Sequence, residues 1–371
     1  MLWIIILIIV LALFGACIFY LSDRFSRFGL VKRIIGERKR LRLVIGIIPI
    51  AVIFAVTALA MNTVNAIICT LHLAAFWLIC DLLFFVIKKI RKKEFKRYYT
   101  GAAAIAVSVC YLTYGWIALH GVWQTDYNIT TAKSVDSIRI VQFADSHIGT
   151  SFSGAQLSEY LERMEDANPD VILITGDFVD DGTSKQDMLD ACSALGKIHT
   201  KYGIYFSFGN HDKGYYDNSI RGYDADDLVN ELEKNNVTVL EDESVLIDNR
   251  FYIVGRKDRS EEERGGSRES MNDLLDGLDT DKYIIVLDHQ PNDYESQAKS
   301  KADLVLSGHT HGGQLIPINI VGELISVNDR TYGTEQRNNT DFVVTSGISD
   351  WSIKFKTGCK SEFVVIDVSE K

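Results

Sequence analysis

The stretch IRIVQFADSH occupies residues 138–147 and shows the pattern that decides the fold. An apolar, β-branched run over 138–143 has the composition of a buried strand, and Asp145 and His147 follow it directly. The same order recurs along the second half of the chain, where apolar runs lead into groups of Gly, Asp, Asn and His. The runs that we interpret as strands are Ile138–Phe143, Val171–Thr175, Ile204–Phe208, Tyr283–Leu287, Leu304–Leu306, Phe342–Thr345 and Phe363–Val368.

Helical patterns separate some of these strands, including Gln156–Ala167 and Lys185–His199. Alternating strands and helices are typical of an α/β domain. In such domains, functional side chains gather at the carboxyl ends of the strands. We therefore expect the polar clusters to converge in space, although they extend from Asp145 to Gln314 along the chain.

Side chains in these clusters have the donor atoms of metal ligands. The candidates are Asp145, His147, Asp177, Asn210, His289, His309 and His311. Carboxylate, amide and imidazole donors without a thiolate suit Mn, Fe or Zn. The set is too large for one tetrahedral zinc ion and suits two ions that share a carboxylate. Two ions about 4 Å apart hold a phosphoryl group between them and acidify water.

Each cluster is weak evidence when it is taken alone, because short motifs have a high false-positive rate. An isolated Asp-x-His is usually a surface feature, and an isolated histidine such as His289 is more often structural. GNHD at 209–212 and GHTHGG at 308–313 are stronger signals. We also expect the two donors of each H/D-x-H pair to lie in extended chain, where both side chains point to one side. The histidines outside the clusters, which we interpret as structural, are His72, His120 and His199.

Taken in order, the clusters resemble the motifs of the calcineurin-like metallophosphoesterases over about residues 139–368. That pattern is D-x-H, GD-x-x-D, GNH-D/E, a single H and GH-x-H, and every part is present. The tail GHTHGGQ at 308–314 resembles the bacterial, membrane-associated branch, some of whose members act on lipid-linked or nucleotide-sugar pyrophosphates. The resemblance implies a four-layer α/β/β/α sandwich with a two-metal site at its edge.

The resemblance also implies a role for each side chain. The first metal would be held by Asp145, His147, Asp177 and His311. The second would be held by Asn210, His289, His309 and a bridging Asp177. His211 would be the general acid or substrate clamp, with its ring oriented by Asp212. Asp180 would orient a metal ligand without touching the metal.

Residues 1–122 differ in composition from the rest of the chain. They hold 15 Lys and Arg against 4 Asp and Glu, a net charge of +11, whereas the remainder holds 24 against 45, a net of −21. Segments in this half have the length and apolarity of membrane spans. We expect four transmembrane helices, near 2–21, 43–61, 66–87 and 101–122. A linker over 123–137 and a phosphoesterase domain over 138–371 would follow.

Charge also predicts the orientation in the membrane. The basic loops 22–42 and 88–97 lie in the cytoplasm by the positive-inside rule, and the turn at 62–65 carries no charge. Four spans then place the catalytic domain outside, in a multi-pass protein of the cell membrane. Within the third span, His72 and Asp81 are expected to be structural. The acidic second half lacks the basic surface that nonspecific nucleic-acid binding needs.

Two further features leave alternatives open. Residues 256–272 are rich in Arg, Glu and Ser, which favours a solvated surface loop over a lid that faces the substrate. Cys192 and Cys359 are the cysteines of the second half, and the sequence does not show whether they pair.

The sequence thus predicts a membrane-anchored phosphoesterase with two divalent metal ions, which would be Mn, Fe or Zn, with Mn favoured. Its substrates would be phosphodiesters, phosphomonoesters or pyrophosphates, including lipid-linked or extracellular ones, and membrane lipid would be a partner. The alternative is a non-catalytic metal-binding membrane sensor, which the loss of a ligand or of His211 would support; neither is lost. A transporter is disfavoured, because the spans hold few ionisable residues.

Overall fold

The computed structural model describes residues 2–36, 38, 41–317, 319–320, 324 and 328–371, apart from the side chains at 2–7 and 9–11. The chain divides into two compact units, Met1–Gly115 and Trp116–Lys371.

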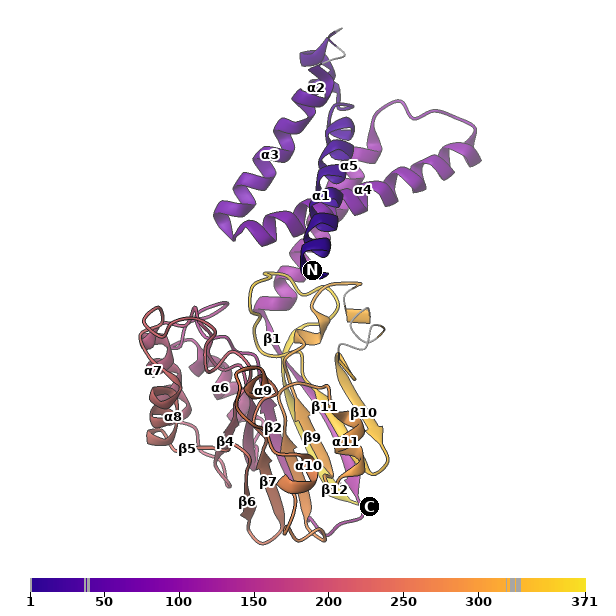
Figure 1. The fold of residues 1–371 in the computed structure, drawn as a ribbon. Helices are drawn as coiled ribbons and strands as arrows, with labels where there is room; N and C mark the ends of the chain where they lie inside the picture. The colour runs from indigo at the N-terminus through magenta and orange to yellow at the C-terminus, as the bar shows by residue number, and fades with distance from the viewer. Residues whose placement is uncertain (1, 37, 39–40, 318, 321–323, 325–327) are drawn as a thin grey trace. The chain divides into compact units, whose positions relative to one another are not determined.

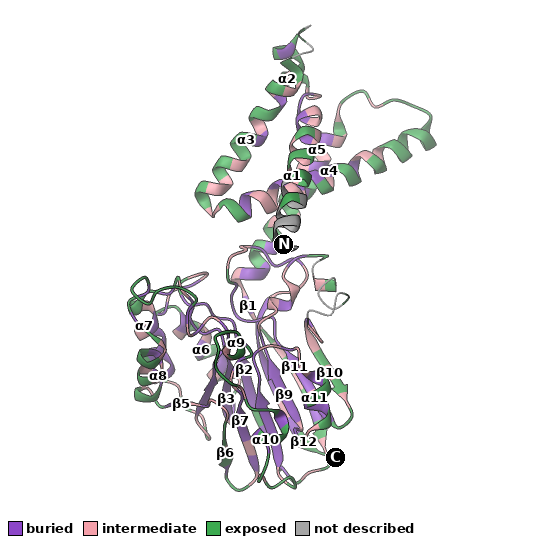
Figure 2. Ribbon diagram, in the orientation of Figure 1, coloured by how far each residue is buried: buried purple, intermediate pink, exposed green. Residues whose placement is uncertain are grey.

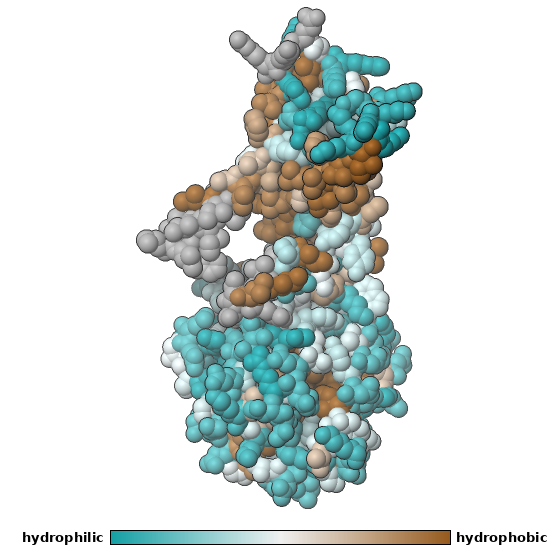
Figure 3. Space-filling model, turned by 90° about the vertical axis from the view of Figure 1, so that its right-hand side faces the viewer, coloured by the Kyte–Doolittle hydropathy of each residue, from teal (hydrophilic) through white to brown (hydrophobic). Residues whose placement is uncertain are grey.

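The first unit is helical. Its helices are α1 (Leu2–Phe25), α2 (Gly29–Ile35), α3 (Arg42–Ala60), α4 (Thr63–Arg91) and α5 (Tyr99–His120), the last of which continues into the second unit. Among the described residues, α3, α4 and α5 are long and apolar enough to cross a membrane, as predicted. The first predicted span coincides with α1, but several of its side chains lie outside the described residues, so a fourth span stays a prediction. Figure 3 shows apolar side chains gathered over these helices.

The ionisable side chains within α4 have structural partners. Asp81 accepts a hydrogen bond from the Tyr20 hydroxyl at 2.8 Å and pairs with Arg24, whose Nε lies 2.6 Å from Asp81 Oδ2. The His72 ring lies 5.7 Å from the Tyr111 ring of α5, and its Nδ1 lies 2.8 Å from the Ile68 carbonyl oxygen. The structural interpretation of both residues is therefore confirmed.

The second unit contains two six-stranded mixed sheets. The first has the order β1-β12-β2-β3-β4-β5. Its strands are β1 (Val122–Thr131), β2 (Ile138–Phe143), β3 (Val171–Thr175), β4 (Ile204–Ser207), β5 (Val237–Val239) and β12 (Ser361–Glu370). Strands β2 to β5 are parallel, β12 runs antiparallel to β2, and β1 is parallel to β12.

The second sheet has the order β10-β11-β9-β8-β7-β6. Its strands are β6 (Glu243–Ile247), β7 (Phe251–Gly255), β8 (Tyr283–Leu287), β9 (Leu304–Ser307), β10 (Gly333–Arg337) and β11 (Thr340–Val344). The four central strands are parallel, and β6 and β10 are antiparallel edges. Strands β3 and β8 are buried along their whole length, which explains their unbroken apolar sequences.

The sheets pack face to face and helices cover their outer faces (Figures 1 and 2). Side chains such as Leu173 and Ile285 fill the space between the sheets. Helices α6 (Leu157–Asp166), α7 (Lys185–Leu195) and α8 (Ala225–Lys234) pack on the first sheet. Helices α10 (Met271–Leu274) and α11 (Tyr294–Lys299) pack on the second. The predicted mixed α/β sandwich with two sheets is confirmed.

The predicted linker over 123–137 is wrong for its first half. Residues 122–131 form β1, which pairs with β12 from Val122 opposite Ser361 to Thr131 opposite Glu370. As an edge strand, β1 buries few of its side chains and therefore keeps a polar sequence without an apolar run. The prediction failed because this strand depends on its partner rather than on burial.

Residues 256–272 match the expected solvated loop only in part, because most residues from 261 to 270 are exposed. They contain α9 (Ser260–Glu263) and the start of α10, and the guanidinium groups of Arg256 and Arg268 are buried against Asp288. Arg256 Nη1 lies 3.0 Å from Asp288 Oδ2 and 2.6 Å from Asp293 Oδ2. The charges of Arg256 and Arg268 therefore serve internal ion pairs, which a charge count along the sequence does not distinguish from solvation. Both Cys192 and Cys359 are free.

Candidate metal centre

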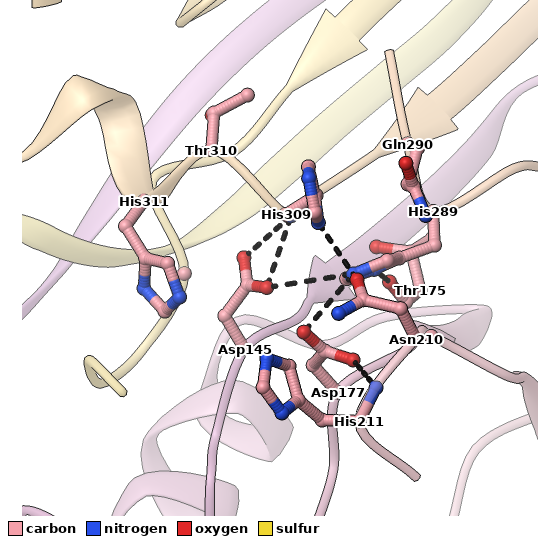
Figure 4. Close-up of polar contacts among 12 residues, drawn as sticks. Asp145, Thr175, Asp177, Asn210, His211, His289, Gln290, His309, Thr310 and His311 are labelled. Carbon is pink, nitrogen blue, oxygen red and sulfur yellow. Dashed lines mark hydrogen bonds and ion pairs between the residues drawn. The ribbon is translucent and has the colours of Figure 1, made fainter. Parts of the chain in front are cut away.

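The predicted ligands follow five parallel strands. Asp145 and His147 follow β2, Asp177 follows β3, and Asn210 follows β4. His289 follows β8, while His309 and His311 follow β9. Because the strands within each sheet are parallel neighbours, their carboxyl ends meet at one edge of the sandwich, where these side chains converge (Figure 4).

The convergence produces two groups of potential metal ligands. One contains Asp145, His147 and His311, the other contains Asp177, His289 and His309, and within each group the donor atoms lie within 4.8 Å of one another. Asp177 Oδ2 lies 3.1 Å from His289 Nε2 and 3.7 Å from His147 Nε2, so it stands between the groups. Asn210 Oδ1 lies 2.8 Å from His309 Nδ1. The structure thus brings all the predicted ligands together.

The buried imidazoles fit cation binding. Among the described residues, His147 has a buried Nε2 without a hydrogen-bond partner, and His289 Nε2 faces the Asp177 carboxylate at 3.1 Å. The opposite nitrogen of His289, Nδ1, donates to the Thr175 carbonyl oxygen at 2.7 Å, so Nε2 is the ring nitrogen that faces the site and would bind a metal. Unpartnered ring nitrogens are costly in a buried site unless a ligand satisfies them.

Electrostatics favour neutral imidazoles at His309 and His311. At His147 and His289, neighbouring carboxylates instead raise the pKa against the effect of burial. Burial, together with the charge of His289, lowers the pKa of His309 to about 4. Burial and the neighbouring His147 lower the pKa of His311 well below its usual value. Neutral imidazole is the form that binds metal ions. Burial also raises the pKa of Asp145 to about 6, against the opposing charge of His289.

The backbone is strained at the ligands themselves. The φ angles are 53° at Asp145, 38° at His147, 51° at Asp177, 69° at His309 and 49° at His311. Residues other than glycine rarely adopt positive φ, and such residues cluster at functional sites. The expectation that the D-x-H and H-x-H pairs are extended is therefore wrong, because both pairs lie beyond the ends of their strands, in turns that direct the side chains individually.

Gly176 permits the closest approach between loops of the site. Its φ is 81°, and a Cβ atom there would lie 2.5 Å from the Gly209 nitrogen and 2.8 Å from His289 Nδ1. Any side chain would push apart the loops that follow β3 and β4. The glycine before Asp177 is therefore required by packing as well as by its backbone conformation.

The role predicted for Asp212 is wrong. Its buried carboxylate accepts hydrogen bonds from the backbone N–H groups of Asp177 at 2.9 Å, Val179 at 3.0 Å and Gly209 at 2.7 Å. Asp212 therefore holds the two loops that carry Asp177 and Asn210, and its oxygens are used by the backbone rather than by the His211 ring. A motif position alone does not distinguish these two uses of a carboxylate.

His211 lies at the border of the ligand groups. Its backbone N–H donates to Asp177 Oδ1 at 2.8 Å, and its ring centroid lies 5.1 Å from that of His147. The ring also lines a pocket of about 510 Å³, whose other lining residues include Asp180, Asp181, Tyr215, Tyr216 and Trp351. His211 thus connects the metal ligands to a space that can hold part of a substrate.

Asp180 has the position that the resemblance implies. Its Oδ2 lies 3.3 Å from His147 Nδ1, on the side of the ring away from Asp177, and its Oδ1 accepts a hydrogen bond from the Gly182 N–H at 2.7 Å. Burial raises the pKa of Asp180, but His147 lowers it by more, so the pKa is below its usual value. Asp180 is therefore placed to orient the His147 ring.

Replacing Asp180 with asparagine is expected to weaken metal binding about 10- to 100-fold, because partners of ligating histidines have effects of this size. Titration of the metal-free protein with Mn²⁺ would measure the change. The exposed Asp276→Asn variant is the control and should bind like the wild type. Equal affinities for the Asp180→Asn variant and the wild type would contradict the orienting role.

Sequence reasoning missed side chains that support Asn210. The Asn210 amide donates to the Tyr215 hydroxyl at 2.8 Å, which directs the amide oxygen toward His309. Arg264 donates to the carbonyl oxygens of Asn210 at 3.0 Å and Gly214 at 2.7 Å, and its guanidinium lies over the Tyr215 ring. The tyrosine pair after GNHD was the only signal, whereas Arg264 comes from the segment that we expected to be solvated.

A two-sheet α/β sandwich with Asp, Asn and His donors at its strand ends defines the metallophosphoesterase class of fold and site. The sequence profile of the calcineurin-like phosphoesterases matches residues 138–313, and the chain belongs to this family.

Relatives in several organisms share this domain. An uncharacterized metallophosphoesterase of Aquifex aeolicus is 33% identical over 51% of this chain and 69% of its own length. A transmembrane protein with metallophosphoesterase domain of Bos taurus is 30% identical over 62% of this chain and 52% of its own. The uncharacterized metallophosphoesterase YkuE of Bacillus subtilis is 25% identical over 75% of this chain and 97% of its own. The chain thus spans only about half of some relatives.

Proposed function

We propose that the chain is a membrane-anchored hydrolase of phosphoric esters that uses two divalent metal ions. The observation that carries this proposal is the position of Asp177, whose Oδ2 lies between His147 of one ligand group and His289 of the other. A carboxylate in this position is suited to bridge two ions. Asp145, His147 and His311 would hold the first ion, and Asn210, His289 and His309 the second.

When bound, the two ions would polarise the phosphoryl oxygens and acidify a water molecule. The residues around them would position the substrate and move protons. His211 borders both the ligand groups and the pocket, and it would donate a proton to the leaving oxygen. Because its backbone N–H is bonded to Asp177, its place is coupled to that of the bridging ligand.

The pocket beside His211 suits an uncharged leaving group. Exposed aromatic rings line it, with Trp351 5.4 Å and Tyr215 5.1 Å from the His211 ring. Its described lining contains the carboxylates of Asp180 and Asp181 and no Lys or Arg. Apolar or ring-bearing groups pack favourably against such aromatic surfaces, whereas a second phosphate would meet only negative charge.

We further propose a lipid-linked or extracellular phosphodiester as substrate, because the catalytic domain follows helices suited to a membrane. A relative named as a transmembrane protein supports the anchoring. A phosphodiester embedded in vesicles and a soluble analogue with the same leaving group would be compared at equal concentration. Faster turnover of the vesicle substrate is expected, and preference for the soluble one would contradict a lipid-linked substrate.

Metal removal is expected to abolish hydrolysis of a generic aryl phosphodiester by the full-length protein. Chelation should reduce the rate at least about 100-fold, since two-metal sites supply several kcal/mol of transition-state stabilisation. Added Mn²⁺ should restore it, with Fe²⁺ and Zn²⁺ as the other candidates because the donors are oxygen and imidazole. An unchanged rate after chelation would refute the proposal. Tight metal binding without hydrolysis of any substrate in a broad phosphoester screen would favour the alternative, a non-catalytic metal-binding membrane sensor.

The catalytic domain is proposed to lie outside the cytoplasm. The basic loops 22–42 and 88–97 would be cytoplasmic, and an even number of spans, including α1, would place the carboxyl terminus on the other side. A reporter that is active only after export from the cytoplasm should be active when it is fused after Lys371. Activity of a cytoplasm-only reporter at the same position would overturn this orientation.

A further inference from the structure

The helical unit contains a basic pocket that catalysis does not use. Its volume is about 620 Å³, and it lies among the end of α1, the second half of α4 and residues 94–100. The basic residues that line it are Arg24, Arg27, Lys32, Lys88, Lys96 and Arg97. The acidic residues that line it are Asp81 and Glu94, so positive charge predominates.

Ion pairs neutralise only part of this charge. Asp81 pairs with Arg24 at 2.6 Å, and Glu94 pairs with Lys88. Arg27 is paired outside the lining, with Asp23 at 2.7 Å. The remaining basic side chains, Lys32, Lys96 and Arg97, are exposed and form no ion pair within the described part of the chain. Three cationic groups therefore face one concave space without an anionic partner.

Apolar surface adjoins this charge. Phe84, Phe85 and Phe95 line the same pocket. Along α4, Leu82, Leu83 and Phe85 are exposed, and so are the apolar side chains of the next turn of the same helix. An occupant that satisfies both features has an anionic head and apolar chains. Free phosphate would satisfy the cations alone and leave the apolar wall in water.

We propose that this pocket binds the headgroup of an anionic phospholipid, whose acyl chains lie along the exposed apolar side of α4. Basic pockets at the ends of membrane helices recognise such headgroups. This inference is independent of the proposed hydrolysis, since Asp81 and the aromatic residues belong to the helical unit.

The simpler explanation is that the basic residues only set the orientation in the membrane. That function requires positive charge in the loops but no particular position for it. Arg33 in α2 and Arg38 beyond it carry the same charge in the basic segment 22–42, are exposed, and do not line the pocket. They therefore provide a matched control, because their removal changes the charge of the basic loops by the same amount.

Native mass spectrometry of the full-length protein in detergent would count bound phosphatidylglycerol and phosphatidylcholine. The wild type should bind phosphatidylglycerol at least about tenfold more tightly than phosphatidylcholine. The double substitution of Lys96 and Arg97 by glutamine should weaken phosphatidylglycerol binding roughly 30-fold, because each side chain loses about one electrostatic interaction with the headgroup. The Arg33→Gln/Arg38→Gln variant should stay within about twofold of the wild type.

Four outcomes would overturn the proposal. Equal losses in both double variants would show that only total charge matters. Equal binding of phosphatidylcholine would exclude recognition of the anionic head. If inorganic phosphate displaced the lipid and bound with an affinity equal to that of the lipid, the pocket would be a small-anion site instead. Thermal unfolding of both variants would be recorded, and a Lys96→Gln/Arg97→Gln variant that unfolds like the wild type yet keeps full lipid binding would also refute it.

Discussion

Replacing Asp177 with asparagine is expected to reduce metal-dependent hydrolysis at least about 1000-fold, which corresponds to about 4 kcal/mol of transition-state stabilisation. Asp177 Oδ2 lies 3.1 Å from His289 Nε2 and 3.7 Å from His147 Nε2, so one charge serves both ligand groups. Asparagine preserves the volume but removes the negative charge that two cations would share. Hydrolysis of an aryl phosphodiester under saturating Mn²⁺ would measure the loss.

The control for this experiment is Asp226→Asn, an exposed substitution on α8 that removes the same charge. It should retain wild-type activity. Asp177→Asn is expected to unfold at a lower temperature than the wild type, because it removes the buried carboxylate that lies 3.1 Å from His289 Nε2, while the contacts of Asp212 to its loop remain. Activities would therefore be compared at a temperature at which both proteins are folded. Full activity of a folded Asp177→Asn protein would refute the assignment of Asp177 as the bridging ligand.

The second large effect is expected on stability, from replacing Asp288 with asparagine. Asp288 Oδ2 receives Arg256, Arg268 and the Gln297 amide, the last at 2.7 Å. The side chains of Asp288, Arg256 and Arg268 are 0%, 6% and 4% exposed. Removing one partner of a buried ion pair leaves uncompensated charge and costs about 3–5 kcal/mol. The unfolding temperature should fall by roughly 6–20 °C for a domain of this size.

The matched control is Glu295→Gln, which breaks an ion pair with Lys299 whose side chains are 84% and 67% exposed. Exposed pairs contribute about 0–1 kcal/mol, so its unfolding temperature should hardly change. Thermal unfolding of the full-length variants would be compared in one detergent. Equal small shifts in both would show that residues 256–272 are not held by Asp288, and the expected solvated loop would stand.

The ligand set was predictable because each residue follows an apolar strand. Val171–Thr175 and Tyr283–Leu287 are buried throughout, so their composition marks them in sequence, and the polar residues just beyond them are conspicuous. Parallel neighbours bring such ends together, which is a property of α/β sheets in general. Asp177 and His289 meet although they belong to different sheets. The same rule explains this, because the two sheets pack face to face and their strand ends adjoin.

What the sequence did not predict depends on partners distant along the chain. Strand β1 is polar because it is an edge strand, and only pairing with Ser361–Glu370 defines it. Asp212 occupies a motif position, but its use is decided by three backbone N–H groups rather than by His211. Arg256 and Arg268 are paired with the buried Asp288. The sequence does not reveal this, because it is the same whether an arginine forms an ion pair or is hydrated.

The most direct test of the central claim is anomalous X-ray diffraction from crystals of the Mn²⁺-loaded, full-length protein. Two anomalous peaks are predicted on either side of the Asp177 carboxylate. One should lie among Asp145, His147 and His311, and the other among Asn210, His289 and His309. A single peak, or peaks away from Asp177, would contradict a two-metal site that shares this carboxylate.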